Sequence, residues 1–291
     1  MQNVNVPCHE VSRGELDRAL DGIRSRAFGR WHTMEYDAFG MDLLAEMRDE
    51  LLDHAAAALR EGPPTRQTRT VLRTAAECAH GLVSLGCFPN GDQLIPFSLV
   101  GEAISSENTA FDCVVEEAAT ARWWVDAWAL IVASGFIQDR REMLSPLLRG
   151  DYAPSIRQGV PHSDHASVSD PADLAEMDAL CLYLAEDHTA ALRTPTAGER
   201  AEGARRLDAV GGALSADQRL LRVLLDDDQE AFERALVARL EQHREQSAAS
   251  AEPPPRTLLP IGTIALAHLA THCHAWTLNV TSDYLPQALT N

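Results

Sequence analysis

The segment from Thr257 to Ser282 contains no Asp, Glu, Lys or Arg, although the whole chain carries a formal net charge of −18. It follows three consecutive prolines at positions 253–255. A helix-forming segment that is apolar on every side must be buried on most of its faces. We therefore expect the C-terminal segment to form a central helix of the fold, surrounded by acidic outer helices.

Helical spacing of apolar residues dominates the rest of the chain, and no stretch shows a convincing β-strand alternation. Capping-box patterns at Ser12 with Glu15 and at Ser215 with Gln218 mark two helix starts. Asp170, followed by a proline, is a further N-cap pattern. The expected helices cover roughly 12–27, 41–59, 66–85, 98–104, 120–136, 139–148, 170–184, 199–210, 216–225 and 228–246.

This pattern predicts an all-α fold. The expected architecture is a single large antiparallel helical bundle or array of about ten to twelve helices, with a buried C-terminal helix. We expect the whole chain, 1–291, to be one domain. Within it, residues 1–157 and 170–291 could form two sub-lobes, separated by a loop that contains two histidines and a proline.

The chain is strongly acidic, with 43 acidic residues against 25 basic ones, all of them Arg. A field this negative repels nucleic acid and anionic membrane surfaces. We therefore expect neither nucleic acid nor a membrane as a partner, and a basic protein suits the surface better. The alternative is that the charge only keeps the protein soluble.

Six cysteines, at positions 8, 78, 87, 113, 181 and 273, include no Cys-x-x-Cys pair and lie mostly in apolar helical pattern. This usage predicts reduced core thiols in a cytoplasmic protein, without disulfides or structural zinc. The first 15 residues lack the basic and apolar regions of a signal peptide. The longest strongly apolar run is shorter than the roughly 20 residues of a membrane span.

A histidine cluster near the C-terminus is the first candidate metal site. His268 and His272 are four residues apart and would share a helix face, whereas His274 would point elsewhere. Zinc or iron needs a third ligand, and the nearest acids in sequence, Glu252 and Asp283, are not on that helix. The alternative is a buried helix whose histidines hydrogen-bond to neighbouring groups. We expect no bound metal and no cofactor.

The run Asp226-Asp227-Asp228-Gln229-Glu230 is the second candidate. It resembles the aspartate-rich magnesium motif of class I terpene synthases, in which carboxylates hold magnesium against a diphosphate. Only 5% of the residues are aromatic, which is few for a carbocation pocket. Acids at a helix start also favour the helix dipole without any metal. No Gly-x-Ser-x-Gly, His-Glu-x-x-His or Walker A pattern occurs, so we expect no catalytic residues.

Three tryptophans lie on the expected helix 120–136. Trp124 and Trp128 are four residues apart and share a stripe, for which core packing is expected. Trp123 points about 100° away from that stripe. If exposed, Trp123 would be a suitable interface anchor, because Trp is enriched at binding hot spots.

Several distinct short segments are spread over nearly the whole chain. They are 28–32 (FGRWH), 74–79 (TAAECA), 85–89 (LGCFP), 151–157 (DYAPSIR), 170–174 (DPADL), 217–222 (DQRLLR), 256–260 (RTLLP), 264–267 (IALA) and 284–286 (YLP). Taken together, these segments resemble the immunity 49 family of bacterial polymorphic toxin systems. No single one of them is chemically diagnostic; their order and spacing carry the resemblance.

The resemblance implies a mostly helical cytoplasmic protein that binds and neutralises a cognate toxin without catalysis. The toxin would usually be encoded by a neighbouring gene. Nuclease toxins are basic because they bind phosphate, so a basic nuclease is the favoured partner. Two alternatives remain open: an all-helical metal-dependent enzyme, with its site at His268 and His272 or at Asp226 and Asp227, and a helical scaffold or regulatory protein.

Three groups of residues are the expected contacts with the toxin. One is the acidic run, another is the turn-rich loop 87–93, and the third is the isolated tryptophan. The alternative for the acidic run is a capped, solvated helix start. The expected partner-binding residues are Asp226, Asp227, Asp228, Glu230, Phe88, Asn90, Asp92 and Trp123.

Overall fold

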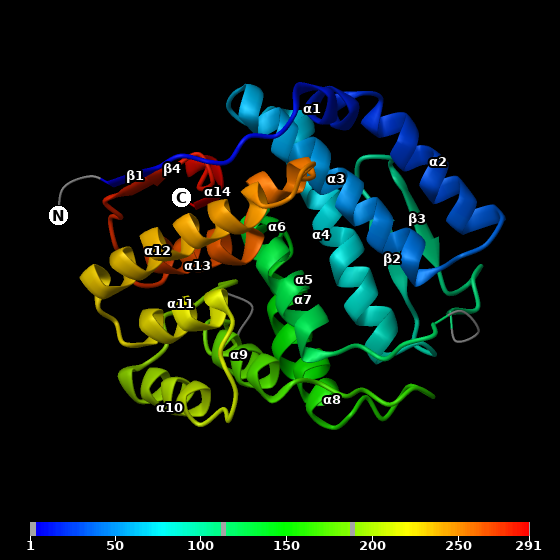
Figure 1. Ribbon diagram of the computed structural model, residues 1–291. Helices are drawn as coiled ribbons and strands as arrows, with labels where there is room; N and C mark the ends of the chain where they lie inside the picture. Colours follow the sequence, from blue (N-terminus) through cyan, green and yellow to red (C-terminus); the bar gives the residue numbers. More distant parts are fainter. Residues whose placement is uncertain (1–3, 112–114, 187–189, 291) are drawn as a thin grey trace.

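The computed structural model describes residues 4–111, 115–186 and 190–290. Helices make up most of this part of the chain, which confirms the all-α prediction (Figure 1). The elements of the first half are β1 (Val4–Val6), α1 (Arg13–Leu20), α2 (Ile23–Tyr36), α3 (Met41–Glu61), α4 (Arg66–Cys87), β2 (Leu94–Phe97) and β3 (Glu102–Ser105).

The second half begins at the central helix and ends with a strand and one short helix. Its α-helices are α5 (Ala121–Ala133), α6 (Phe136–Asp139), α7 (Arg141–Pro146), α8 (Ala153–Arg157), α9 (Pro171–Cys181), α10 (Ala197–Asp208), α11 (Ala216–Leu225), α12 (Gln229–Ala248), α13 (Ile261–His272) and α14 (Gln287–Thr290). A π-helical turn (Leu147–Tyr152), a 3-10 turn (Pro255–Leu258) and β4 (Val280–Ser282) complete it. Helices α6 and α14, of four residues each, are not among the expected helices, whereas the short α8 lies in the segment 151–169, for which the sequence predicts a short helix followed by a loop.

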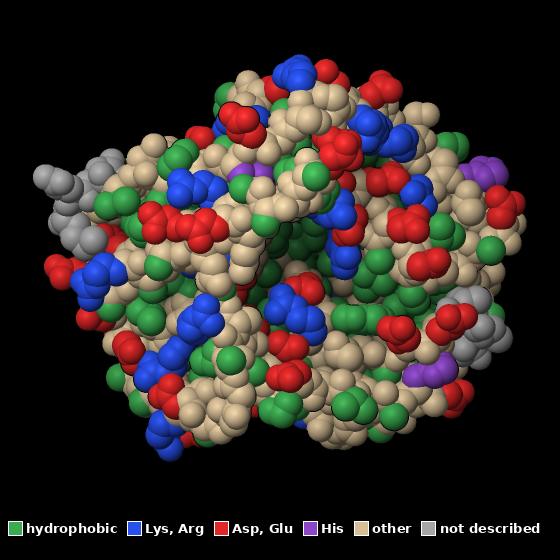
Figure 2. Space-filling model, in the orientation of Figure 1, with side chains coloured by type: hydrophobic (Ala, Val, Ile, Leu, Met, Phe, Trp, Pro, Cys, Tyr) green, Lys and Arg blue, Asp and Glu red, His purple; other side chains and the backbone are tan. Residues whose placement is uncertain are grey.

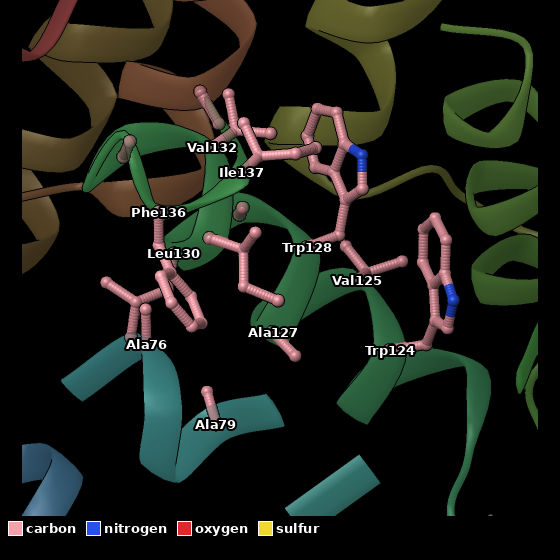
Figure 3. Close-up of a cluster of buried hydrophobic side chains, with 14 of the residues drawn as sticks. Ala76, Ala79, Trp124, Val125, Ala127, Trp128, Leu130, Val132, Phe136 and Ile137 are labelled. Atoms are coloured by element: carbon pink, nitrogen blue, oxygen red, sulfur yellow. The ribbon is translucent and has the colours of Figure 1, made fainter. Parts of the chain in front are cut away.

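Helix α5 is apolar on nearly every side and lies at the centre of the fold. It packs against α4, α9 and α13, and in Figure 1 it separates the α3–α4 pair from the group α9 to α12. Trp124 and Trp128 are fully buried on it, with stacked rings 6.5 Å apart (Figure 3). The indole of Trp124 donates a hydrogen bond of 3.0 Å to the carbonyl of Leu148. The expectation of core packing for this pair is confirmed.

The uncharged C-terminal segment forms a buried helix over less of its length than expected. Helix α13 is buried from Thr263 to Ala270 and packs against α5. The helix ends at His272, and Ala275 adopts the left-handed conformation with φ 56°. The chain then runs extended into β4, which pairs in parallel with β1. The β-branched Val280 and Thr281 favour a strand over a helix here.

A β-hairpin replaces the helix expected over 98–104. Strands β2 and β3 pair antiparallel, with Ile95 opposite Ile104. Ile95, Phe97 and Ile104 are buried, so the alternation that favours a strand was present but short. The buried carboxylate of Glu77 fixes the turn, because it accepts hydrogen bonds from the backbone N–H and the hydroxyl of Ser98.

The predicted helix starts hold in all three cases, but only one of the two predicted capping boxes is complete. Ser215 and Gln218 form a reciprocal capping box, and the side chain of Asp170 caps α9. Ser12 accepts a hydrogen bond from the backbone N–H of Glu15, but the Glu15 side chain pairs with Arg18 instead of returning to the cap. The helix expected over 12–27 is also divided, because the chain turns at residues 21–22 between α1 and α2.

A polar network joins the first residues of the chain to the last elements. The His9 ring bonds to the Tyr284 hydroxyl at 2.6 Å through Nδ1 and to the Thr257 hydroxyl at 2.9 Å through Nε2. The His243 ring lies beside both His9 and Tyr284 and contacts the Thr257 carbonyl at 2.7 Å. Together with the β1–β4 pair, these contacts fix the N-terminal segment against the C-terminal one.

One cluster of buried hydrophobic side chains contains residues from Val6 to Leu289 and so includes both predicted sub-lobes. The division into one domain or two stays a prediction. The described cysteines are free thiols, and Cys113 lies outside the described residues. Within the described ranges, no helix has the length and apolar character needed to cross a bilayer.

Gly86 marks a close approach of α4 to the chain before α5 and gives a test of this packing. A Cβ at Gly86 would lie 2.7 Å from the backbone nitrogen of Ala119. We expect Gly86→Ala to lower the free energy of unfolding by about 1–3 kcal/mol, measured by urea denaturation. Gly29→Ala is the matched control, because Gly29 is exposed on α2 with nothing within 4 Å of the added Cβ.

The control should raise stability by about 0.5–1 kcal/mol through better helix propensity. Equal effects of the two substitutions would contradict the packing described for α4.

Candidate partner-binding surface

The acidic run predicted to contact a partner forms the junction between α11 and α12. Asp226, Asp228 and Glu230 are exposed there. The Asp228 side chain caps α12 by accepting a hydrogen bond from the backbone N–H of Ala231 at 3.0 Å. Asp226 pairs with Arg222 at 2.5 Å. Part of the acidity at this junction therefore serves the local structure.

Asp227 lies at the surface but also binds side chains that are largely buried. It adopts φ 60°, and its two carboxylate oxygens bind Arg200 at 2.7 Å and the His274 Nδ1 at 2.6 Å. The other nitrogen of His274 bonds to the Tyr183 hydroxyl at 2.9 Å. Burial lowers the pKa of His274, although Asp227 acts in the opposite direction. A substitution at Asp227 therefore disturbs the fold together with the surface.

The loop 87–93 between α4 and β2 is fixed by aromatic contacts and hydrogen bonds of Phe88. The Phe88 ring lies 6.0 Å from that of Tyr152 and 5.4 Å from that of His162. Its carbonyl accepts hydrogen bonds from the backbone N–H of Gly91 and from the Gln93 side chain. Phe88 is therefore partly buried, whereas Asn90 and Asp92 are exposed at the tip.

Trp123 lies at the start of α5 and lines a pocket of about 600 Å³. Its side chain is partly buried and packs against the hydrophobic core. The pocket lies between α3, α4 and α5, and Figure 2 shows a hollow in the middle of this face, with hydrophobic side chains at its floor and charged ones around its edge. Its charged lining consists of Asp42, Glu116, Glu117, Asp126 and Arg48.

A buried carboxylate lies next to the start of α5. Glu176 on α9 is 3% exposed and accepts a hydrogen bond of 3.1 Å from the side chain of Gln218. The guanidinium of Arg122 lies 3.8 Å from Glu176 and also pairs with Asp126. Burial raises the pKa of Glu176 to about 7, and the attraction to Arg122 only partly offsets this rise.

The histidine cluster does not gather a metal-ligand set. His268 and His272 stack at 5.3 Å, and burial lowers the pKa of His268 to about 4, with His272 adding to the effect. Across 4–111, 115–186 and 190–290, no group of three or more His, Cys, Asp or Glu side chains is placed to hold a metal ion. His272 lines a pocket of about 910 Å³ beside β4, in which the charged groups Arg60 and Asp283 pair at 3.0 Å.

The three predicted contact groups lie apart. Figure 1 places the α11–α12 junction and the α4–β2 loop on opposite sides of the molecule, and Trp123 belongs to neither. The structure instead brings Trp123 next to acids from two other segments, at residues 42 and 116–117, and next to Asp126 of its own helix. The pair Glu116-Glu117 has no Arg within four positions, which is a sequence signal for free acids.

A comparison with protein-family models matches residues 64–289 to immunity protein 49. This match covers more than half of the chain. The chain belongs to the immunity protein 49 family. Elements β1 and α1 to α3, including the segment 28–32, lie outside the matched range of this family. No curated protein and no solved structure matches the chain.

Membership of the immunity protein 49 family confirms the resemblance predicted from the short segments. The matched range includes every predicted contact residue, from Phe88 to Glu230. It also includes three of the four pocket carboxylates, whereas Asp42 comes from α3, outside the range. The pocket is therefore completed by the part of the chain that the family model does not cover.

The buried carboxylate gives a pH-dependent prediction. Because the folded-state pKa of Glu176 is raised, the ionised side chain costs stability above pH 7, and this cost disappears as the pH falls. Glu176→Gln keeps an acceptor for Gln218 and removes the charge. We expect it to raise the free energy of unfolding by up to about 3 kcal/mol at pH 8, with the difference vanishing near pH 4.5.

Urea denaturation of both proteins at several pH values measures this difference. Glu241→Gln, at an exposed position on α12, is the control, and it should change stability little at any pH. A destabilised Glu176→Gln variant at pH 8 would show that the carboxylate is needed in its charged form.

Proposed function

We propose that this protein binds a cognate bacterial toxin and neutralises it by protein–protein contact, without catalysing a reaction. Membership of the immunity protein 49 family carries the proposal. Neutralisation requires only a surface complementary to the toxin. The acidic chain provides electrostatic complementarity to a basic protein surface.

The charge of the chain favours a basic toxin, and a nuclease is the class we propose. Nucleases carry basic surfaces because they bind a phosphate backbone. A protein with a net charge of −18 attracts such a surface over long range and accelerates encounter. An acidic protein bound there would also repel the nucleic acid. The cytoplasm, where a nuclease meets its substrate, is the compartment we propose.

Co-expression tests the proposal. The gene product adjacent to this chain should arrest growth when expressed alone, and co-expression of this protein should restore growth. The two proteins should also co-purify as a complex, because the proposed mechanism is sequestration. Rescue without a complex would point to enzymatic modification of the toxin or its product, and the proposal would be wrong.

A catalytically inactive variant of the toxin provides the control. It should bind this protein with the same affinity as the active toxin, because binding by surface complementarity does not need toxin activity. Loss of binding with the inactive variant would indicate recognition of a reaction product instead.

A further inference from the structure

The pocket beside Trp123 presents an aromatic ring and unpaired carboxylates together. Four carboxylates and one guanidinium line it. Arg48 is already bound to Asp49 at 2.8 Å, and Asp126 to Arg122. Glu116 and Glu117 are exposed, and no arginine in the described part of the chain pairs with either of them. The carboxylates of Glu116 and Glu117 are therefore available to bind a positively charged group of a partner.

Elsewhere in this protein, an aromatic ring and two carboxylates together bind an arginine side chain. On α4, the guanidinium of Arg73 lies 5.2 Å from the ring centroid of Phe136. Its nitrogens also bind the carboxylates of Glu77 and Asp139, each at 3.1 Å. One aromatic ring and two carboxylates thus fix one arginine. The pocket repeats this set with Trp123, Glu116 and Glu117 but contains no arginine in that place.

We propose that this pocket receives an arginine side chain from a basic segment of the toxin. The guanidinium would stack on the indole of Trp123, since Trp is the strongest cation–π acceptor among the aromatic side chains. Glu116 and Glu117 would accept its N–H groups, because a planar guanidinium matches carboxylates in a bidentate arrangement. This inference rests on the proposed function and adds the chemistry and place of the contact.

An arginine-bearing segment fits the pocket better than a lone cation does. The volume, about 600 Å³, exceeds the needs of a single guanidinium. The apolar side chains of Phe39, Met41 and Leu82 also line the pocket and would cover the apolar stem or a neighbouring residue of the same segment. A basic nuclease surface supplies arginines of this kind.

The test measures affinity for the toxin with two kinds of variant. Trp123→Ala removes the stacking surface, and Glu116→Gln with Glu117→Gln removes two charges. We expect each to weaken binding by about tenfold or more, mainly through faster dissociation. Trp123→Phe should lose less than Trp123→Ala. The double glutamine variant should also show a flatter dependence of affinity on salt.

A control with the same change of charge lies in the second half of α12. Glu241→Gln with Glu245→Gln removes two exposed carboxylates there, neither of them an expected contact, and should leave affinity within about twofold. Loss of affinity in this control, with none in the Glu116 and Glu117 variant, would overturn the proposal. Thermal melting shows that each variant is folded, and the exposed Glu116 and Glu117 give a variant that does not depend on core packing.

A double-mutant cycle identifies the arginine. Each exposed arginine of the toxin is changed to Ala and measured against both wild type and Trp123→Ala. One arginine should show a coupling of about fivefold or more with Trp123. If wild type binds the toxin and no arginine couples, the pocket proposal is wrong while the proposed function stands. If wild type does not bind the toxin, the proposed function itself is wrong.

Discussion

The packing of α5 against α13 is the constraint on which the rest of the structure depends. Both helices are apolar on nearly every side, and each can be buried only when other helices surround the pair. Helices α4 and α9 pack against α5, and α11 packs against α13. The charged residues of α5, Arg122 and Asp126, both lie in its first two turns, where the helix reaches the surface. The pocket opens at this same place, and the half-buried Trp123 lines it.

Acidic residues are not confined to the exterior of this protein. Glu77, Glu176 and Glu233 are buried and accept hydrogen bonds from other elements. The carboxylate of Glu233 on α12 accepts hydrogen bonds from the backbone and the side chain of Asn279. It thereby fixes the extended segment that leads into β4. Glu77 and Glu233 thus hold non-helical segments in place, because the backbone N–H groups of those segments have no helix to pair within. Glu176 instead joins α9 to the side chain of Gln218 on α11.

Most helices could be predicted from local signals. The apolar spacing in α3 and α4, and the caps at Ser215 and Asp170, depend on neighbours within a few residues. The hairpin was missed because each strand shows only two or three alternating positions, and its turn depends on Glu77, which is distant in sequence. The pocket could not be predicted for the same reason, since its acids come from α3, α5 and the chain between β3 and α5. Trp123 could be singled out, but its neighbours could not.

Strands β1 and β4 pair although they are far apart in the sequence, so they are synthesised at different times. Residues 4–6 are synthesised some 270 residues before their partners at 280–282. His9 likewise has no Thr257 or Tyr284 to bond until those distant residues are made. Strand β1 therefore stays unpaired until β4 exists, however early α3 and α4 associate.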